Sequence, residues 1–252
     1  MTQTPAELRL VALRGLPMVA PGNDLAALLR TAASAQGLAL AGGVLVVAQK
    51  IVSKAEGRLV QLADVEPSAQ ARQIAASDGK DPRHVEVVLR ETARVVRHAH
   101  GVWIAETRHG FVCANAGVDL SNAPGADTAV LLPLDPDASA RQLREDLVAA
   151  GAGPLAVIVS DTFGRPWREG LVDVALGSAG LAPLADWRGR RDLAGRPLEV
   201  TAMALVDQLA AAAGLLMGKD AGLPAVWIEG VAPSGYGNVR ELLRDPSADL
   251  FR

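Results

Sequence analysis

The segment SDTFGRPWREG, at residues 160–170, carries the densest group of side chains that could do chemistry. It places an acid, Asp161, and a hydroxyl, Thr162, just before two arginines, Arg165 and Arg168. The apolar run PLAVIV directly before it predicts a buried strand that ends beside the acid. These groups at a strand end are suited to a metal ion and phosphate. Taken alone, the acid and hydroxyl are equally well explained as a turn or cap closing the strand.

A second segment, CANAGVDLSN at residues 113–122, combines small residues with an acid and amides. Small residues let the backbone approach a ligand closely, whereas Asp119 and Asn122 offer polar contacts. Taken alone, the segment is better explained as an Asx-type turn after a strand. Together with Asp161, however, Asp119 could hold one Mg²⁺ or Mn²⁺, and Thr162 could reach a second ion. Two ions bridging phosphate oxygens would suit phosphoryl transfer.

Cationic residues follow another apolar run, VLVVA at residues 44–48. Lys50, Lys54 and Arg58 are candidates for phosphate or nucleotide contact, with a solvated basic turn as the alternative. A second cationic group occupies a Gly-rich region: Arg165, Arg168, Arg188, Arg190 and Arg191. Such a group in an acidic chain predicts an anionic substrate, although some of its members are expected to be surface ion-pair partners. Cys113 is better explained as a small core residue than as a nucleophile.

Composition excludes several classes of protein. With 252 residues, a net charge of −3 and 3% aromatic residues, the chain is globular and unsuited to nucleic acid. A single cysteine excludes a disulfide framework and a cysteine zinc site within one chain. We find no signal peptide and no apolar run of about 18 residues, so we expect a cytoplasmic protein without membrane contact. Neither a P-loop nor a G-x-G-x-x-G motif is complete.

The expected elements mix helices and strands without strict alternation, which favours an α+β fold over a doubly wound sheet. Strands are predicted at 44–48, 155–159 and 224–228, and a hairpin at 103–106 and 110–114. Helices are predicted from residue 25, over most of 66–98, from a capping box at Ser139 to about Ala150, at 201–217 and at 239–244. The region 163–198 is predicted to be rich in loops.

Taken in order, these stretches resemble the coenzyme F420-0:L-glutamate ligase family. The matching segments cover nearly the whole chain: GLP and PGNDL within 15–25, VVAQKIVSKAEGR at 46–58, ANAGVDLSN at 114–122, LPLDPDASA at 132–140, DTFGRPWREG at 161–170 and DLFR at 249–252. The third and fifth segments are highly specific in combination.

The resemblance implies a GTP-dependent amide ligase. Such enzymes add L-glutamate to the lactyl-phospho end of a deazaflavin coenzyme precursor, and often a second glutamate through the γ-carboxylate. The resemblance also implies Mg²⁺ or Mn²⁺, two ions in each site, stimulation by K⁺, and an intertwined homodimer of unusual α+β fold with mixed sheets and packed helices. We expect one ligase unit over residues 1–252, divided if at all into two subdomains at an unknown boundary, without the reductase-like domain of some relatives.

Position by position, the resemblance gives Asp119 and Asp161 as ligands of the first ion and Thr162 as a ligand of the second. Nucleotide contacts fall on Leu16, Pro17, Met18, Val19, Gln49, Lys54, Asn122, Met217, Gly218 and Lys219. Lys219 stands where archaeal relatives have an amide or acid ligand for the second ion, and an ammonium group cannot ligate a metal.

In the expected chemistry, the acceptor carboxylate attacks the γ-phosphoryl group of GTP, and the glutamate amine then attacks the acyl phosphate. Arg165 and Arg168 are the expected catalytic residues, because their guanidinium groups could hold phosphate or the glutamate carboxylate. Two alternatives stay open. One is a related nucleotide-dependent amide ligase with a different acceptor. The other is a non-catalytic GTP- or GDP-binding protein, against which the acids and Thr162 argue.

Overall fold

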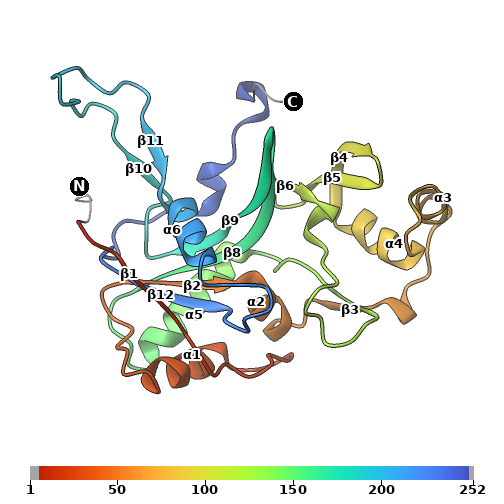
Figure 1. The fold of residues 1–252 in the computed structure, drawn as a ribbon, viewed down its shortest axis with the longest axis horizontal. Coiled ribbons are helices and arrows are strands. Elements are labelled where there is room, and N and C mark those ends of the chain that lie inside the picture. Colours follow the sequence, from red (N-terminus) through yellow and green to blue (C-terminus); the bar gives the residue numbers. More distant parts are fainter. Residues whose placement is uncertain (1–5, 250–252) are drawn as a thin grey trace.

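The computed structural model describes residues 6–249, so residues 250–252 of the C-terminal DLFR motif lie outside the described residues. A mixed five-stranded sheet, in the order β1-β12-β2-β8-β9, forms the centre (Figure 1). Its strands are β1 Arg9–Ala12, β12 Ala225–Glu229, β2 Val44–Ala48, β8 Ala156–Arg165 and β9 Arg168–Ala179. The β2–β8 pair is parallel and the other neighbouring pairs are antiparallel. The three buried strands expected from apolar runs are thereby confirmed.

Helices cover both faces of this sheet. Helices α1 (Leu25–Ser34) and α5 (Pro136–Ala149) lie on one face and α6 (Leu205–Gly214) lies on the other (Figure 1). Successive side chains of a strand point to opposite faces, so the continuous apolar runs supply both layers. In β2, Leu45 and Val47 join the layer with α1 and α5, whereas Val44 and Val46 join the layer with α6. The predicted α+β class is confirmed.

Gly177 of β9 allows α5 to approach the sheet. A Cβ atom at this position would lie 2.1 Å from the carbonyl oxygen of Pro136, the first residue of α5. We expect Gly177→Ala to destabilise the protein by about 3 kcal/mol, because backbone on both sides must shift. Urea denaturation measures this change, with Gly164→Ala as the control, since a Cβ there would meet only Leu171, at 3.9 Å. Equal stability losses in the two variants would contradict the packing argument.

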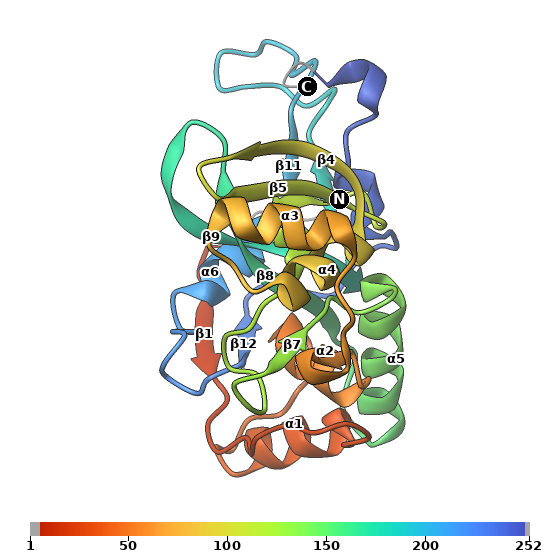
Figure 2. The same ribbon diagram turned by 90° about the vertical axis from the view of Figure 1, so that its right-hand side faces the viewer.

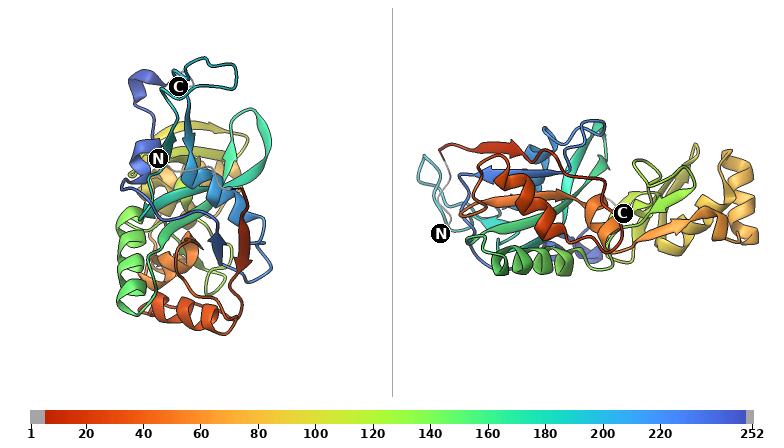
Figure 3. Two further views of the ribbon diagram at one scale, coloured as in Figure 1. Left: turned by 90° about the vertical axis from the view of Figure 1, so that its left-hand side faces the viewer. Right: turned by 90° about the horizontal axis from the view of Figure 1, so that it is seen from below.

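Residues 59–130 form a small lobe beside the central sheet (Figures 2 and 3). Its elements are β3 Leu59–Gln61, η1 Leu62–Asp64, α3 Ala69–Asp78, α4 Pro82–Glu91, β4 Thr92–Ala99, β5 Val102–Thr107, β6 Val112–Ala114, η2 Asn115–Gly117 and β7 Thr128–Val130. Strand β3 pairs with β7, and β4, β5 and β6 form a separate sheet, which includes the hairpin expected at 103–114. The small lobe has its own apolar cluster around Trp103 and Val87.

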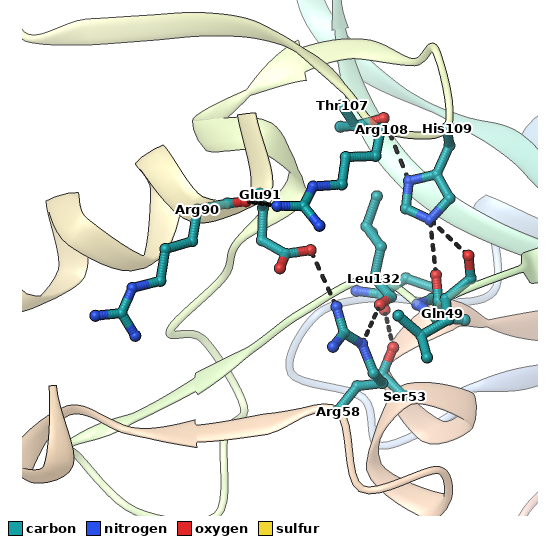
Figure 4. A network of polar contacts seen from close by, with 11 residues as sticks. Gln49, Ser53, Arg58, Arg90, Glu91, Thr107, Arg108, His109 and Leu132 are labelled. Atoms are coloured by element: carbon teal, nitrogen blue, oxygen red, sulfur yellow. Dashed lines mark hydrogen bonds and ion pairs between the residues drawn. The ribbon is translucent and has the colours of Figure 1, made fainter. Parts of the chain in front are cut away.

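Charged side chains join the small lobe to the segment that leads into α5 (Figure 4). The Arg58 guanidinium donates to the carbonyl of Leu132 at 2.9 Å and to the Glu91 carboxylate at 3.0 Å. His109 Nε2 donates to the carbonyl of Pro133 at 2.9 Å. Arg58, a candidate for phosphate contact by sequence, therefore holds the two lobes together.

None of the described helices is long and apolar enough to span a membrane.

Several sequence-based expectations were wrong in their boundaries. The helical prediction for 66–98 fails over its last part, because β-branched residues continue the chain as strand β4 after α4 ends at Glu91. The loop-rich prediction for 163–198 misses β9 and β10 (Leu184–Asp186). The 201–217 helix is shorter, since β11 (Ala202–Ala204) pairs with β10 before α6 begins.

Three helical segments also differ from the sequence-based expectations. Helix α5 begins at Pro136, where the Asp135 carboxylate accepts from the Ala138 N–H at 3.0 Å, and not at the capping box expected from Ser139. Residues 49–55 form helix α2 (Gln49–Ala55), which the sequence analysis did not predict. The helix expected at 239–244 is a short 3₁₀ turn, η3 (Val239–Leu242). A second 3₁₀ turn, η4 (Pro246–Ala248), follows it.

Candidate active site

A cavity of about 550 Å³ opens where the parallel pair β2–β8 ends. The last paired residues are Ala48 and Ser160, after which the chain turns from β2 into α2 while β8 continues to Arg165. The departure of β2 leaves the edge of β8 open beyond Ser160. Ligands commonly bind outside the carboxyl ends of parallel strands. The buried part of β8 ends at Ser160, next to Asp161, as the sequence predicted. The strand itself continues to Arg165, so the prediction that it ends beside Asp161 was wrong.

The cavity gathers almost all of the predicted site residues from five separate segments. The following line it: Leu16, Pro17, Met18, Val19, Gln49, Lys54, Asp119, Asn122, Asp161, Thr162, Met217, Gly218 and Lys219. Two of these segments touch directly, because the Asn122 side-chain amide donates to the Lys219 carbonyl at 3.2 Å. Segments nearly one hundred residues apart in sequence thus meet at one site.

Arg165 and Arg168 do not line the cavity. They are exposed residues at the tip of the β8–β9 hairpin, where the Arg165 guanidinium donates to the Glu169 carbonyl at 2.7 Å. Their assignment as catalytic residues stays a prediction. Of the other arginines, Arg188 pairs with Asp186 at 2.6 Å, as expected for a surface ion pair, and Arg190 stacks near Trp187.

Asp119 is tied to the basic residues of α2. Its carboxylate forms an ion pair with the Lys50 ammonium at 2.6 Å and accepts hydrogen bonds from the Ser121 backbone and hydroxyl at 2.7 and 3.0 Å. Burial opposes ionisation of this carboxyl group, but these contacts outweigh it and the pKa of Asp119 is lowered. Asp119 is therefore ionised at neutral pH, with the Lys50 ammonium as its counter-charge.

Asp161 has the opposite electrostatic setting. Burial raises its pKa to about 7, and the nearby carboxylates of Asp119 and Asp173 contribute in the same direction. The Thr162 N–H and the Lys50 charge oppose this rise without cancelling it. A perturbed carboxyl group in a cavity is typical of a functional site. A bound divalent cation would favour its ionised form.

The raised pKa of Asp161 predicts how the stability of the metal-free protein depends on pH. The pKa is about 7 in the folded state against an ordinary value of 3.8 for an aspartate, so folding binds a proton between these pH values and stability falls as pH rises from about 4 to 7. Asp161→Asn removes the free-energy cost of ionising this carboxyl group in the folded protein. In a chelating buffer, we expect the variant to raise the Tm more at pH 8 than at pH 5. An equal change at both pH values would contradict the raised pKa.

Two buried polar side chains of the cavity are incompletely partnered: Lys54 lacks an ion-pair partner and Gln49 has an unsatisfied donor among the described residues. Lys54 is 5% exposed, and no carboxylate within residues 6–249 forms an ion pair with its ammonium group. Burial and the neighbouring Lys50 charge lower the pKa of Lys54. Gln49 is 1% exposed; its Oε1 accepts from the Ser53 hydroxyl at 2.8 Å, while its Nε2 has no partner among the residues that the structure describes. Buried donors without partners are costly, so an anionic or carbonyl-bearing ligand would stabilise both residues.

The structure also places residues in the cavity that the sequence analysis did not select. Asp173 and Asp220 line it. The acid at 173 could have been found only by predicting the β8–β9 hairpin. Cys113 lines the cavity as well, but burial raises the pKa of its thiol to about 12, so it stays protonated and is a poor nucleophile.

The donor set in the cavity fits divalent cations that prefer oxygen. Within residues 6–249, no three His, Cys, Asp or Glu side chains form one metal-binding cluster. Magnesium, however, usually takes only one or two protein carboxylates and completes its shell with water and phosphate oxygens. Asp119, Asp161 and the Thr162 hydroxyl can supply such ligands, and their net negative charge favours a cation there.

An α+β fold with a charged cavity at the end of a parallel strand pair is typical of an enzyme that acts on small anionic molecules. Comparison with known proteins identifies the class: the model of the family described as F420-0:gamma-glutamyl ligase matches residues 15–230. The chain belongs to this family of ligases.

Relatives in archaea match over almost the full chain. A protein named coenzyme F420:L-glutamate ligase from Methanothermobacter thermautotrophicus is 48% identical over 251 residues, covering 97% of this chain and 99% of the relative. A protein of the same name from Methanopyrus kandleri is 49% identical over 240 residues, or 93% of each chain. One from Haloarcula marismortui is 43% identical over 253 residues, covering 97% and 96%.

Proposed function

We propose that this protein uses GTP to join L-glutamate to a deazaflavin precursor of coenzyme F420 through an amide bond. The observation that carries the proposal is the convergence of five motif-bearing segments on one cavity. This cavity also contains the ionised Asp119 and the buried Lys54, whose ammonium group has no ion-pair partner among the described carboxylates. A cavity that holds a buried ammonium group and several carboxylates is suited to a nucleotide triphosphate and its counter-ion. The relatives named for this activity agree with the proposal.

Some residues of the cavity would bind the nucleotide, and others would assist transfer of its γ-phosphoryl group. Lys54 would bind phosphate oxygens, and the Gln49 amide and Asn122 would orient the nucleotide together with the 16–19 and 217–224 segments. The acceptor carboxylate would attack the γ-phosphoryl group, so that a carboxyl oxygen–phosphorus bond forms and GDP leaves. The glutamate amine would then attack the acyl carbon, forming the amide and releasing phosphate. Positioning and electrostatic stabilisation supply most of the catalysis in such transfers.

Divalent cations held by Asp119, Asp161 and Thr162 would neutralise charge on the phosphate oxygens during transfer. Lys50 would have to exchange its contact with Asp119 for one with phosphate when such a cation binds, because one carboxylate oxygen is held at 2.6 Å in their ion pair. Stimulation by K⁺ is part of the same proposal.

A homodimer is the proposed assembly. Strand β4 is exposed along most of its length, including Val95 and Val96, and among the described strands it pairs on one side only, with β5. The segment 184–204 extends from the main sheet with Leu193 and Val200 fully exposed to solvent (Figure 1). Apolar side chains on a free sheet edge and a protruding segment are typical of surfaces that a second copy covers.

A mass-spectrometric assay tests the proposed activity. The protein is incubated with the precursor, L-glutamate, GTP and Mn²⁺, with separate reactions that contain ATP or other carboxylate acceptors. We expect the deazaflavin precursor to gain the mass of one or more glutamate residues, with GDP formed in proportion. Turnover only with a different acceptor would support a related amide ligase, and tight GDP binding without any turnover would support a non-catalytic role.

A further inference from the structure

Asp173 is a cavity carboxylate that lies outside all of the segments matched by resemblance. It lies on β9, directly opposite Thr162 of β8 in the antiparallel ladder. Residues directly opposite each other in such a ladder project from the same face, with Cβ atoms about 5 Å apart. Both residues line the cavity. The Thr162 hydroxyl and the Asp173 carboxylate therefore reach the same part of it.

The protein itself provides little to balance the charge of Asp173. A Cβ atom on Gly214, the last residue of α6, would lie 2.5 Å from Asp173 Oδ2, so this carboxylate lies against the carboxyl end of a helix. That end of a helix carries partial negative charge, which disfavours another anion. The ion pairs found within residues 6–249 do not include Asp173.

The neighbouring groups increase this imbalance. Asp119 and Asp173 both act on Asp161 as nearby negative charges. Lys50, the cation that also acts on Asp161, is already paired with Asp119 at 2.6 Å. The three acids nevertheless do not form one cluster with a common centre among the described residues. Neighbouring residues of a strand project to opposite faces, so Asp161 points away from the face of the β8–β9 ladder that Thr162 and Asp173 share.

We propose that Asp173 is the anionic ligand of the second divalent cation, for which the family resemblance already gives Thr162 as a ligand, at a position distinct from the one between Asp119 and Asp161. This inference rests on the proposed function, which requires cations in the same cavity. A carboxylate and a hydroxyl are hard oxygen ligands, and water and phosphate would complete the shell of Mg²⁺ or Mn²⁺. Lys219 also lines the cavity but cannot ligate a metal, so Asp173 supplies the anionic ligand for this second position.

Binding of Mn²⁺ tests the proposal without any assay of activity. Free Mn²⁺ is followed by electron paramagnetic resonance as the full chain is titrated. We expect two Mn²⁺ per wild-type chain. Asp173→Asn should weaken binding of one Mn²⁺ at least about tenfold and leave binding of the other unchanged. Loss of a group that only orients a metal ligand already weakens metal binding about tenfold, so loss of a ligand should cost at least as much. Thr162→Val, which replaces the hydroxyl by a methyl group of similar size, should weaken the same site.

Asp220→Asn is the matched control, because Asp220 also lines the cavity and its loss removes the same charge. We expect this variant to keep both Mn²⁺ sites. Two sites of wild-type affinity in Asp173→Asn or in Thr162→Val would overturn the proposal, as would equal weakening in Asp173→Asn and Asp220→Asn. If Mn²⁺ binding follows the expected pattern but no glutamate is added in any reaction, the cation site stands and the proposed function fails.

Discussion

Asp161→Asn should lower kcat at least about 1,000-fold while the fold is retained. The substitution keeps the size of the side chain but removes one carboxylate oxygen from the cation site, and stabilisation of phosphoryl charge by such a site is worth several kcal/mol. A loss of about 4 kcal/mol corresponds to this factor in rate. Steady-state release of GDP with precursor and glutamate measures the change.

Asp64→Asn is the control for this prediction, since Asp64 is an exposed acid of η1 that does not line the cavity. Its kcat should equal that of the wild type. Circular dichroism and the Tm show whether Asp161→Asn is folded; its Tm in chelating buffer at pH 8 should be no lower than that of the wild type. A folded Asp161→Asn variant with wild-type GDP release would contradict a role for Asp161 at the cation site.

Lys54→Met should weaken binding of GDP and GTP by about 10- to 100-fold. The ammonium group is buried and has no ion-pair partner among the described carboxylates, so a phosphate would be its charged partner. Loss of a hydrogen bond to a charged group costs about 1.5–3 kcal/mol, which corresponds to this range of Kd. Methionine keeps the apolar part of the side chain and therefore most of its packing.

Isothermal titration calorimetry with GDP measures the effect of this substitution. Lys80→Met is the matched control, because Lys80 lies in the small lobe and does not line the cavity. The two variants should differ clearly in their affinity for GDP. An unchanged Kd for Lys54→Met would place the nucleotide elsewhere. In addition, the Tm of metal-free, nucleotide-free Lys54→Met should rise, since the substitution removes an uncompensated buried charge.

The sequence predicted the main strands because their apolar runs are continuous and bury both faces. Residues 44–48, 155–159 and 224–228 lie side by side in the central sheet, close to the predicted bounds. Segment 92–99 was mispredicted as helical because its strand conformation depends on pairing with β5, a contact that local propensity does not report. Strand β9 was missed for a related reason, since its polar first half resembles a loop until it pairs with β8.

Residue types and motif order in the sequence indicated which residues form the candidate site, but they did not indicate how these residues are arranged. Asp119, Asp161 and Lys54, selected from the sequence as metal and nucleotide ligands, lie together in one cavity, and their roles stay predictions. The sequence could not show that Asp173 faces Thr162, because cross-strand register depends on the bulges in the β8–β9 hairpin. It also could not show that the hairpin tip carries Arg165 away from the cavity walls.

Transfer of ¹⁸O from the acceptor carboxylate tests the central claim most directly. The deazaflavin precursor is labelled in its carboxyl oxygens and incubated with the protein, L-glutamate, GTP and Mg²⁺, and the released phosphate is analysed by mass spectrometry. If the carboxylate attacks the γ-phosphoryl group, the first amide bond formed on each labelled precursor should release one phosphate that carries one labelled oxygen. Formation of that first amide with unlabelled phosphate would contradict an acyl phosphate and the mechanism built on this cavity.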